Sequence, residues 1–518
     1  MHNYRHKQEI AAPLKPRLPL PPAILLTKEA TIYALSPSSQ FADERESYYF
    51  HHYCNETATQ ITGPFSNSLW IRLVPQISET TPFIKHAILA LGALSKSRID
   101  IFQQHGVYDS RNVSLLNSHH QYALLQYSKT LKGIREASQD SSKDSITALI
   151  ACLLVFCFEC WQRHQAAATA HAATAVTLIS QLRFKQNGHA CVFSDACIPR
   201  YLDVDLYSAF SGLDLQALLF VDNRTTTMHQ TLQDGMCSTI QGIPVKFSDL
   251  QQCRNYWQII MRRNLHFVAA ARAATFNTVT PKDDVQEIST LRVGNNIWSH
   301  VPGKPKGILT TLLEKRALCV EDIRRWEHAS APLFAETCKT DNSSIQDFLL
   351  STVPKIHAAM SIVLLGLAFY PTELAADRFL PEFRTVVDLS YLIQHLLIPA
   401  STSPSMPIFR FDIGILPAIS QVGLLCRDKE IRGKAIDLLL GNPGYREAIW
   451  ESIVVGKICE FARTIEEVWC DGRGFVPGNR RATLTSVEFY GRWGRAEFAQ
   501  RLGPSNGGVM MRVKCFTW

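Results

Sequence analysis

Zinc binding is the first chemistry to consider for this sequence, because Cys157 and Cys160 form a C-x-x-C pair with Cys152 nearby. A binuclear zinc cluster needs six thiolates in closely spaced pairs, and no second pair follows this one. All three cysteines lie in the most apolar run of the chain, where cysteine behaves as a small hydrophobe. We therefore interpret them as core residues. Cys191 and Cys197 form a looser pair without His or Cys partners in register, so no metal is predicted there.

Histidines are the next candidate ligands. Those that lie near one another in the sequence are His51, His52, His119, His120, His164 and His171. Adjacent helical residues point in different directions, so neither doublet can chelate one ion alone. His164 and His171 are two helical turns apart, which is too far for shared ligation. Surface or hydrogen-bonded core histidines are the favoured interpretation.

Motifs for nucleotide binding or catalysis do not occur. The sequence has no G-x-x-x-x-G-K-[ST], G-x-S-x-G or H-E-x-x-H, and the glycines at 472, 474 and 478 do not fit a dinucleotide fingerprint. Asp203 and Asp205 are paired carboxylates without a glycine-rich loop or clustered histidines. We predict no enzymatic activity, no catalytic residues and no cofactor.

One cationic concentration lies near the C-terminal end, interleaved with Phe489 and Trp493. Its members are Arg473, Arg480, Arg481, Arg492, Arg495 and Arg501. Arginine beside aromatic residues suits phosphate and base contact, so nucleic-acid binding is one interpretation. A solvated hairpin face is the other, and Glu488 and Glu497 favour it because they dilute the positive field.

Composition indicates a globular chain. Of 518 residues 46% are hydrophobic and 19% are charged, and the net charge of +7 is too dilute to indicate a nucleic-acid surface by itself. Basic residues and prolines interrupt the first thirty residues, so no signal peptide is predicted. The apolar runs at 148–158 and 358–370 are too short to span a bilayer. We expect an intracellular chain with reduced thiols and no membrane association.

The elements that must position these residues are helices, because apolar residues recur at three-and-four spacing. Thr81 and Pro82 suit an N-cap and a first helical residue, which predicts a helix at 83–94. Further helices are predicted at 120–134, 145–161, 165–182, 257–274, 308–329, 344–369 and 381–397, with three more between 411 and 470. Pro354 is expected to break the 344–369 helix. Arg432, Lys434 and Asp437 are expected on exposed faces.

The remaining segments have weaker patterns. Residues 183–250 contain short segments of no clear order, 277–305 predict an irregular connection, and 400–407 predict a linker. ATLTSVEFY and RAEFAQRL flank the turn at 491–494 and suggest a terminal hairpin. The expected domains are a flexible arm (1–45), a helical regulatory domain (46–470) and a tail with a hairpin (471–518). The fold class is all-α, a multi-helix bundle with a short C-terminal β-hairpin or irregular tail.

Several blocks together resemble one family. They are residues 48–94, which end in HAILALGAL, HQYALLQYSKTLKGI (120–134), LIACLLVFCFE (149–159), and 411–452, which contain C-R-D and I-R-x-x-A-I-x-L-L. In this order they are similar to the helical regulatory body of fungal zinc-cluster transcription factors. The resemblance implies a nuclear transcription regulator of a metabolic or secondary-metabolite pathway. Its partners would be other transcription regulators, a DNA-binding partner or a small-molecule effector.

The sequence departs from that family at one point. The six-cysteine zinc cluster, the basic linker and the short coiled coil of the family are absent from these 518 residues. Two explanations stay open: the chain acts through a DNA-binding partner, or an upstream exon encodes the cluster and the chain contacts DNA directly. A helical enzyme or accessory protein of a biosynthetic pathway, without DNA binding, is the alternative function.

Overall fold

The computed structural model describes residues 41–63, 68–105, 117–138, 145–174, 204–220, 222, 224–275, 310–337, 344–370, 373–398, 406–472, 474–490, 493–501 and 508–517. Residues Arg45–Trp518 form one compact unit, separate from Met1–Glu44. Most of the predicted arm, the 277–305 connection, the pair Cys191 and Cys197, and most of the 400–407 linker lie outside the described residues. The fold is helical with strands toward the C-terminus, as predicted.

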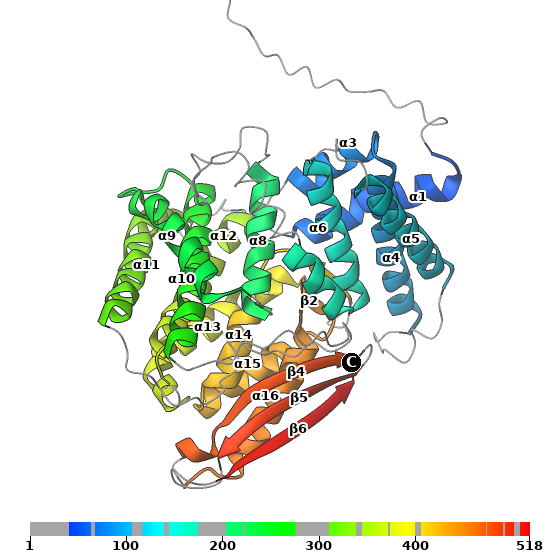
Figure 1. Ribbon diagram of the computed structural model, residues 1–518. Helices are drawn as coiled ribbons and strands as arrows, with labels where there is room; N and C mark the ends of the chain where they lie inside the picture. The colour runs from blue at the N-terminus through cyan, green and yellow to red at the C-terminus, as the bar shows by residue number, and fades with distance from the viewer. Residues whose placement is uncertain are drawn as a thin grey trace, which may run out of the picture. The chain divides into compact units, whose positions relative to one another are not determined.

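Short helical segments begin the compact unit and lead into three long helices. The segments are α1 (Glu44–His52), η1 (Tyr53–Thr57), α2 (Ala58–Thr62), η2 (Leu69–Leu73) and α3 (Val74–Ser78). They are followed by α4 (Pro82–His105), α5 (Ser118–Ser138) and α6 (Ser145–Gln162). All three long helices were predicted. The apolar stripe of α4 is buried, and α4 packs against both α5 and α6 (Figure 1).

The middle of the chain is also helical. A helical segment at 165–174 is followed by α8 (Val204–Phe220), α9 (Thr226–Gln241), α10 (Leu250–Thr275) and α11 (Thr310–Thr337). Both α8 and α9 fall where the sequence suggested no clear order. The Thr225 side chain caps α9 by accepting a hydrogen bond from the backbone N–H of Met228. Trp257 and Trp326 pack together with ring centroids 4.7 Å apart and join α10 to α11.

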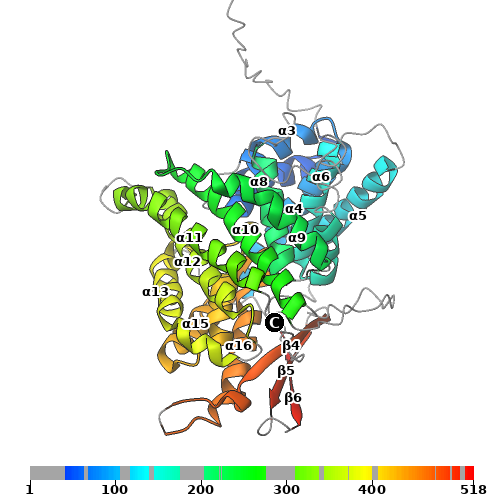
Figure 2. The ribbon, with the colours of Figure 1, turned by 60° about the vertical axis from the view of Figure 1, so that its left-hand side comes forward.

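Helix α12 (Ile345–Leu367) corrects one expectation, because it runs through Pro354 without a break. Proline removes one backbone hydrogen bond, but Pro354 is buried and the helix packs against α10, α11 and α13 (Leu380–Leu397) on both sides of it (Figure 2). By length and composition α12 could cross a membrane, yet 83% of its apolar window is buried within the fold. It is therefore placed as a core helix. A 3₁₀ segment, η5 (Glu373–Phe379), connects α12 to α13.

The block at 411–452 combines helices with a small sheet. Its elements are β1 (Ile408–Arg410), α14 (Leu416–Leu425), α15 (Lys429–Leu440), β2 (Tyr445–Glu447) and β3 (Trp450–Glu451), followed by α16 (Ser452–Glu467). Strand β2 lies between a parallel β1 and an antiparallel β3. The sequence predicted the three helices but not these short strands, which carry too few residues for a period-two pattern.

After the 3₁₀ turn η6 (Gly478–Arg480), the C-terminal segment forms a three-stranded antiparallel sheet. Strands β4 (Ala482–Tyr490) and β5 (Trp493–Arg501) make the predicted hairpin, and β6 (Val509–Thr517) adds a strand that was not predicted. The inner side of β5 buries Ala496 and Phe498, and α16 packs against β4 and β6. The sheet therefore shares the core of the helical body.

Gly92, within HAILALGAL, lies where α4 passes the preceding helices at close range. A Cβ at this position would lie 2.4 Å from the carbonyl oxygen of Tyr49. We expect Gly92→Ala to lower the free energy of unfolding by about 1–3 kcal/mol, as overpacking does in other cores. A Cβ added to Gly433 in α15 would have no neighbouring atom within 4 Å. Gly433→Ala is therefore the matched control, with unchanged or slightly raised stability in denaturant titrations.

Candidate functional site

The predicted nucleic-acid contacts are not brought together as one free cationic face in the described residues. Arg480 lies over the Trp469 ring, 3.8 Å from its centroid, and Arg495 pairs with Glu497 at 2.5 Å. Arg481 is buried and donates two hydrogen bonds to Asp377, at 2.8 and 2.6 Å. Arg481 therefore holds η5 to the start of β4 and is committed to the fold.

Two other members of the arginine group, Arg473 and Arg492, lie outside the described residues, as does the side chain of Arg501. Nucleic-acid contact by Arg473, Arg480, Arg481, Arg492 and Arg495 stays a prediction.

The cysteines interpreted as core residues are buried. Cys157 and Cys160 are in the interior of α6, and burial raises their pKa well above that of an ordinary thiol. A neutral thiol is neither a metal ligand nor a nucleophile. Cys152 is half-buried on the same helix. Within the described ranges, no group of three or more His, Cys, Asp or Glu side chains could hold a metal ion.

The histidines have separate partners. His119 contacts the Tyr49 hydroxyl at 2.7 Å and Asp100 at 3.2 Å, whereas His164 pairs with Glu159 at 2.8 Å. These contacts tie α5 to α1 and α4, and they cap the end of α6. Asp205, which the sequence suggested as solvated surface, accepts hydrogen bonds from the backbone and hydroxyl of Ser68. Asp203 lies outside the described residues.

Arg432 corrects another expectation, because it is buried whereas Lys434 and Asp437 are exposed as predicted. Its Nη1 donates to Glu466 Oε2 at 2.6 Å, and Arg427 Nη2 donates to Oε1 at 2.5 Å. The amphipathic pattern of α15 had suggested solvent, but α16 presents a buried carboxylate at this position. Although burial by itself raises the pKa of Glu466, the two arginines lower it overall, so the carboxylate is ionised.

The same carboxylate holds the C-terminal sheet. The backbone N–H of Ala482, the first residue of β4, donates to Glu466 Oε1 at 2.6 Å. Asp428 accepts a hydrogen bond from the Ile431 N–H at 2.9 Å and caps α15 beside the cluster. Glu466 therefore links α15, α16 and β4 through one charged group.

A second buried carboxylate, Glu451 on β3, joins segments that are far apart in the sequence. It pairs with Arg163, which follows α6, and with Arg446 on β2 at 2.7 Å. Arg98 of α4 lies in the same cluster and donates to the carbonyl of Trp161. Burial alone would raise the pKa of Glu451, but Arg163 and Arg446 lower it, so the carboxylate is charged. Three arginines depend on this one glutamate.

A third buried carboxylate, Glu447 on β2, faces the start of α14. It accepts hydrogen bonds from the backbone N–H groups of Gly414, Ile415 and Leu416 at 2.8–3.0 Å, and from the Tyr445 hydroxyl at 2.9 Å. Burial raises its pKa to about 7, although these donors act in the opposite direction. The side chain serves as an N-terminal cap that reaches α14 from another element.

Polar residues also gather between α8, α9 and α10. Asp214 accepts from Arg262 Nη2 at 2.8 Å and from Arg224 at 2.6 Å, and the Nδ1 atoms of His229 and His266 lie 2.9 Å apart. Burial alone would raise the pKa of Asp214, but the arginines hold it well below its ordinary value. Burial lowers the pKa of His229 to about 4 and also lowers that of His266. The two imidazoles are therefore neutral near pH 7.

His357 on α12 gives a prediction for the pH dependence of stability. Its Nε2 donates to the Gly414 carbonyl at 2.6 Å, and burial lowers its pKa to about 4. An unfolded histidine titrates near 6.5, so between about pH 6.5 and 4 the unfolded state binds more protons than the folded state. The contribution of His357 to stability is thus present above pH 6.5 and is lost as the pH falls toward 4, by about 3 kcal/mol in total.

His357→Gln keeps a hydrogen-bond donor and removes the titration. We expect the free energy of unfolding of this variant to fall less steeply between pH 6.5 and 4 than that of the unmodified protein. His395→Gln on α13 provides the comparison, because His395 is exposed. Equal slopes for His357→Gln and the unmodified protein would show that His357 does not titrate as described.

The buried carboxylates described above, Asp214, Glu447, Glu451 and Glu466, are therefore matched with arginines or with hydrogen-bond donors. Each arrangement stabilises contacts between elements, and none of the three glutamates combines with a neighbouring nucleophile into a catalytic set of the kind described for acid–base enzymes. Sequence reasoning missed Glu447, Glu451 and Glu466. The signal in the sequence was that these three glutamates stand among apolar residues between 445 and 466.

Together these features define a helical scaffold in which a few buried charged clusters connect segments that are far apart in the sequence. Residues 48–263 match the family described as fungal specific transcription factor domain. No curated protein and no solved structure matches the chain. This stretch of the chain is therefore similar to the fungal specific transcription factor domain, and the similarity supports a role as a transcription regulator. Domains of this family are usually non-enzymatic.

Proposed function

We propose that this protein controls a metabolic or secondary-metabolite pathway in the nucleus, through contacts with partner regulators or a small-molecule effector. The observation that carries the proposal is the family match over residues 48–263. The architecture supports it, because the Glu451 cluster makes the matched region and the 411–452 block into one body that a ligand at either part could influence.

Contact with DNA is proposed to run through a DNA-binding partner. Arg481 is committed to Asp377, Arg480 lies over Trp469, and Arg495 pairs with Glu497. Direct phosphate contact would give a steep loss of affinity with salt in a mobility-shift series. A shift by the purified protein at low salt that disappears in the Arg480→Ala, Arg495→Ala double variant would replace the partner route with direct binding.

Gene deletion with complementation tests the regulatory role. We expect deletion to change the transcript levels of a defined gene set, and we expect the unmodified gene to restore them. A gene carrying Glu460→Gln should restore them as well and serves as the control. Glu460 is half-exposed on α16, and its distance of 3.9 Å from Arg463 makes a weak ion pair. A transcript profile that is the same with and without the gene would contradict the proposal.

Nuclear localisation is tested in the same strains. A fluorescent fusion that complements the deletion is expected to accumulate in the nucleus. A complementing fusion that stays outside the nucleus under inducing and non-inducing conditions would contradict that part of the proposal.

A further inference from the structure

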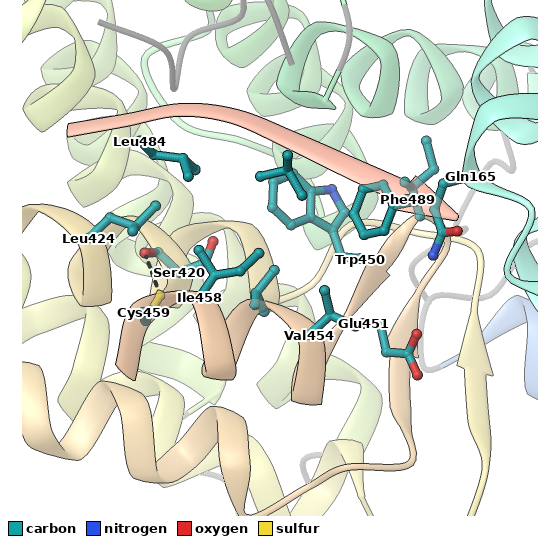
Figure 3. Close-up of a pocket in the computed structure, with 13 residues that line it drawn as sticks. Gln165, Ser420, Leu424, Trp450, Glu451, Val454, Ile458, Cys459, Leu484 and Phe489 are labelled. Atoms are coloured by element: carbon teal, nitrogen blue, oxygen red, sulfur yellow. Dashed lines mark hydrogen bonds between the residues drawn. The ribbon is translucent and has the colours of Figure 1, made fainter. Parts of the chain in front are cut away.

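A cavity lies where the C-terminal sheet meets the helical body (Figure 3). Its walls come from α14, β3, α16 and β4, and Gln165 at the start of the 165–174 helix completes it. Its volume is about 50 Å³, counted over positions open to the centre of a water-sized sphere. One water needs about 10–15 Å³ by this measure, so the space suits a molecule of single-ring size.

The two ends of the cavity differ in chemistry. Figure 3 shows Leu424 and Leu484 at one end, and Gln165 with Glu451 at the other. The walls between them are mostly apolar and include Val454 and Ile458. Ser420 and Cys459 also line the cavity, but each donates its hydrogen to a backbone carbonyl. A molecule that fills this space must therefore have an apolar body and a polar group on one side only.

The polar end contains an acceptor that has no partner. Gln165 is 4% exposed, and its Oε1 is buried without a hydrogen bond. Buried polar atoms are nearly always hydrogen-bonded, so an unpaired amide oxygen at a cavity wall points to a donor supplied by a ligand. Glu451 beside it is an acceptor as well, which favours a donor group and disfavours an anion.

A cationic ligand is disfavoured for a different reason. The charge of Glu451 is already matched by Arg163 and Arg446, with Arg98 in the same cluster. A further buried cation would therefore meet an excess of positive charge. The group that fits is uncharged and donates a hydrogen bond, as a hydroxyl does.

On these grounds we propose that the cavity between β4 and helices α14 and α16 is an effector site for a small uncharged hydroxyl compound of single-ring size, with the hydroxyl on Gln165. The inference rests on the proposed regulatory function and names the site at which it would be controlled. Because Leu484, Val487 and Phe489 of β4 form one wall, an occupied cavity would stabilise the sheet against α16. A contact between the sheet and a partner protein would then depend on whether the ligand is bound.

Phenol is a suitable probe, with toluene as the analogue that lacks the hydroxyl and benzoate as the anionic analogue. We expect calorimetric titration of the full chain to show binding in the order phenol, toluene, benzoate. The hydrogen bond to Gln165 should make phenol about five- to tenfold tighter than toluene. Absence of saturable phenol binding would overturn the proposal, as would equal binding of phenol and benzoate.

Two variants place the binding in this cavity. Val454→Phe fills it and should abolish phenol binding, whereas Val468→Phe, at a residue 73% exposed near the end of the same helix, should leave binding unchanged. Gln165→Leu keeps the space and should remove the preference of phenol over toluene. Phenol binding that persists in Val454→Phe, or a preference that persists in Gln165→Leu, would contradict the assignment.

These measurements use purified protein and do not depend on transcription. Saturable phenol binding to the purified protein, together with a transcript profile that gene deletion leaves unchanged, would reject the regulatory function and keep the site. A changed transcript profile without phenol binding would reject the site and keep the regulatory function.

Discussion

Glu466→Gln is expected to lower the free energy of unfolding by about 3–5 kcal/mol, because it leaves two buried arginines without a counter-charge. Arg427 and Arg432 each donate to one carboxylate oxygen, and both side chains are buried. The neutral amide of glutamine cannot balance the charges of the two arginines. Its NH2 group would also replace one of the two carboxylate oxygens, so that a donor would face the donors of a guanidinium group. Denaturant titration followed by circular dichroism measures the loss.

Glu460→Gln on the same helix is the control for this prediction. Its side chain is 47% exposed, and its pair with Arg463 spans 3.9 Å, so the expected change is below about 0.5 kcal/mol. Comparable losses in Glu460→Gln and Glu466→Gln would show that the effect comes from α16 in general and not from the buried cluster. Since Ala482 also bonds to Glu466, the Glu466→Gln variant should in addition be cleaved faster by proteases near β4.

Glu451→Gln is expected to cost a similar amount, about 3–5 kcal/mol, for the same physical reason. Here Arg163 and Arg446 lose their charged partner, and Arg98 stays in a cluster with no negative charge. The measurement is again the midpoint of denaturant unfolding. This substitution differs from Glu466→Gln because its partners come from the matched region as well as from the late block.

Glu430→Gln is the control for the Glu451 cluster. Glu430 pairs with Lys434 at 2.6 Å, but its side chain is 62% exposed, so solvent screens the pair. We expect the midpoint of denaturant unfolding to stay where it is in the unmodified protein. A loss in Glu451→Gln no larger than that in Glu430→Gln would mean that the three arginines do not depend on the glutamate.

Periodicity was enough to predict the long helices. The Thr81–Pro82 start of α4, the continuous apolar face of α6 and the buried cysteines within it follow from residue pattern alone. The hairpin of β4 and β5 was equally visible, because nine-residue strands provide enough alternation. These elements have local signals that tertiary contacts did not override.

Other parts depend on contacts between residues far apart in the sequence. Arg432 fits the exposed face of α15 when read alone, and only the position of Glu466 explains its burial. Pro354 would break an isolated helix, but α12 is held by its neighbours on both sides. β6 was missed because its alternation leaves it mostly exposed, with only Phe516 buried. Tertiary context decides all three.

The cavity could not be predicted at all. Gln165, Glu451 and Leu484 belong to three separate segments, and no spacing in the sequence relates them. The family resemblance implied an effector without indicating a position. Local pattern predicts which elements form, whereas the site comes from how they meet.

The Glu451 cluster joins α6, in the family-matched region, to β2 and β3, which lead into α16. Hydrogen exchange on the unmodified protein and on Glu451→Gln tests this connection most directly, by comparing backbone protection in α6 with that in α16. We predict that protection falls together in both helices, because Arg163 follows α6 and Glu451 precedes α16. A fall confined to α16, with α6 as protected as before, would show that the Glu451 cluster does not couple the two regions.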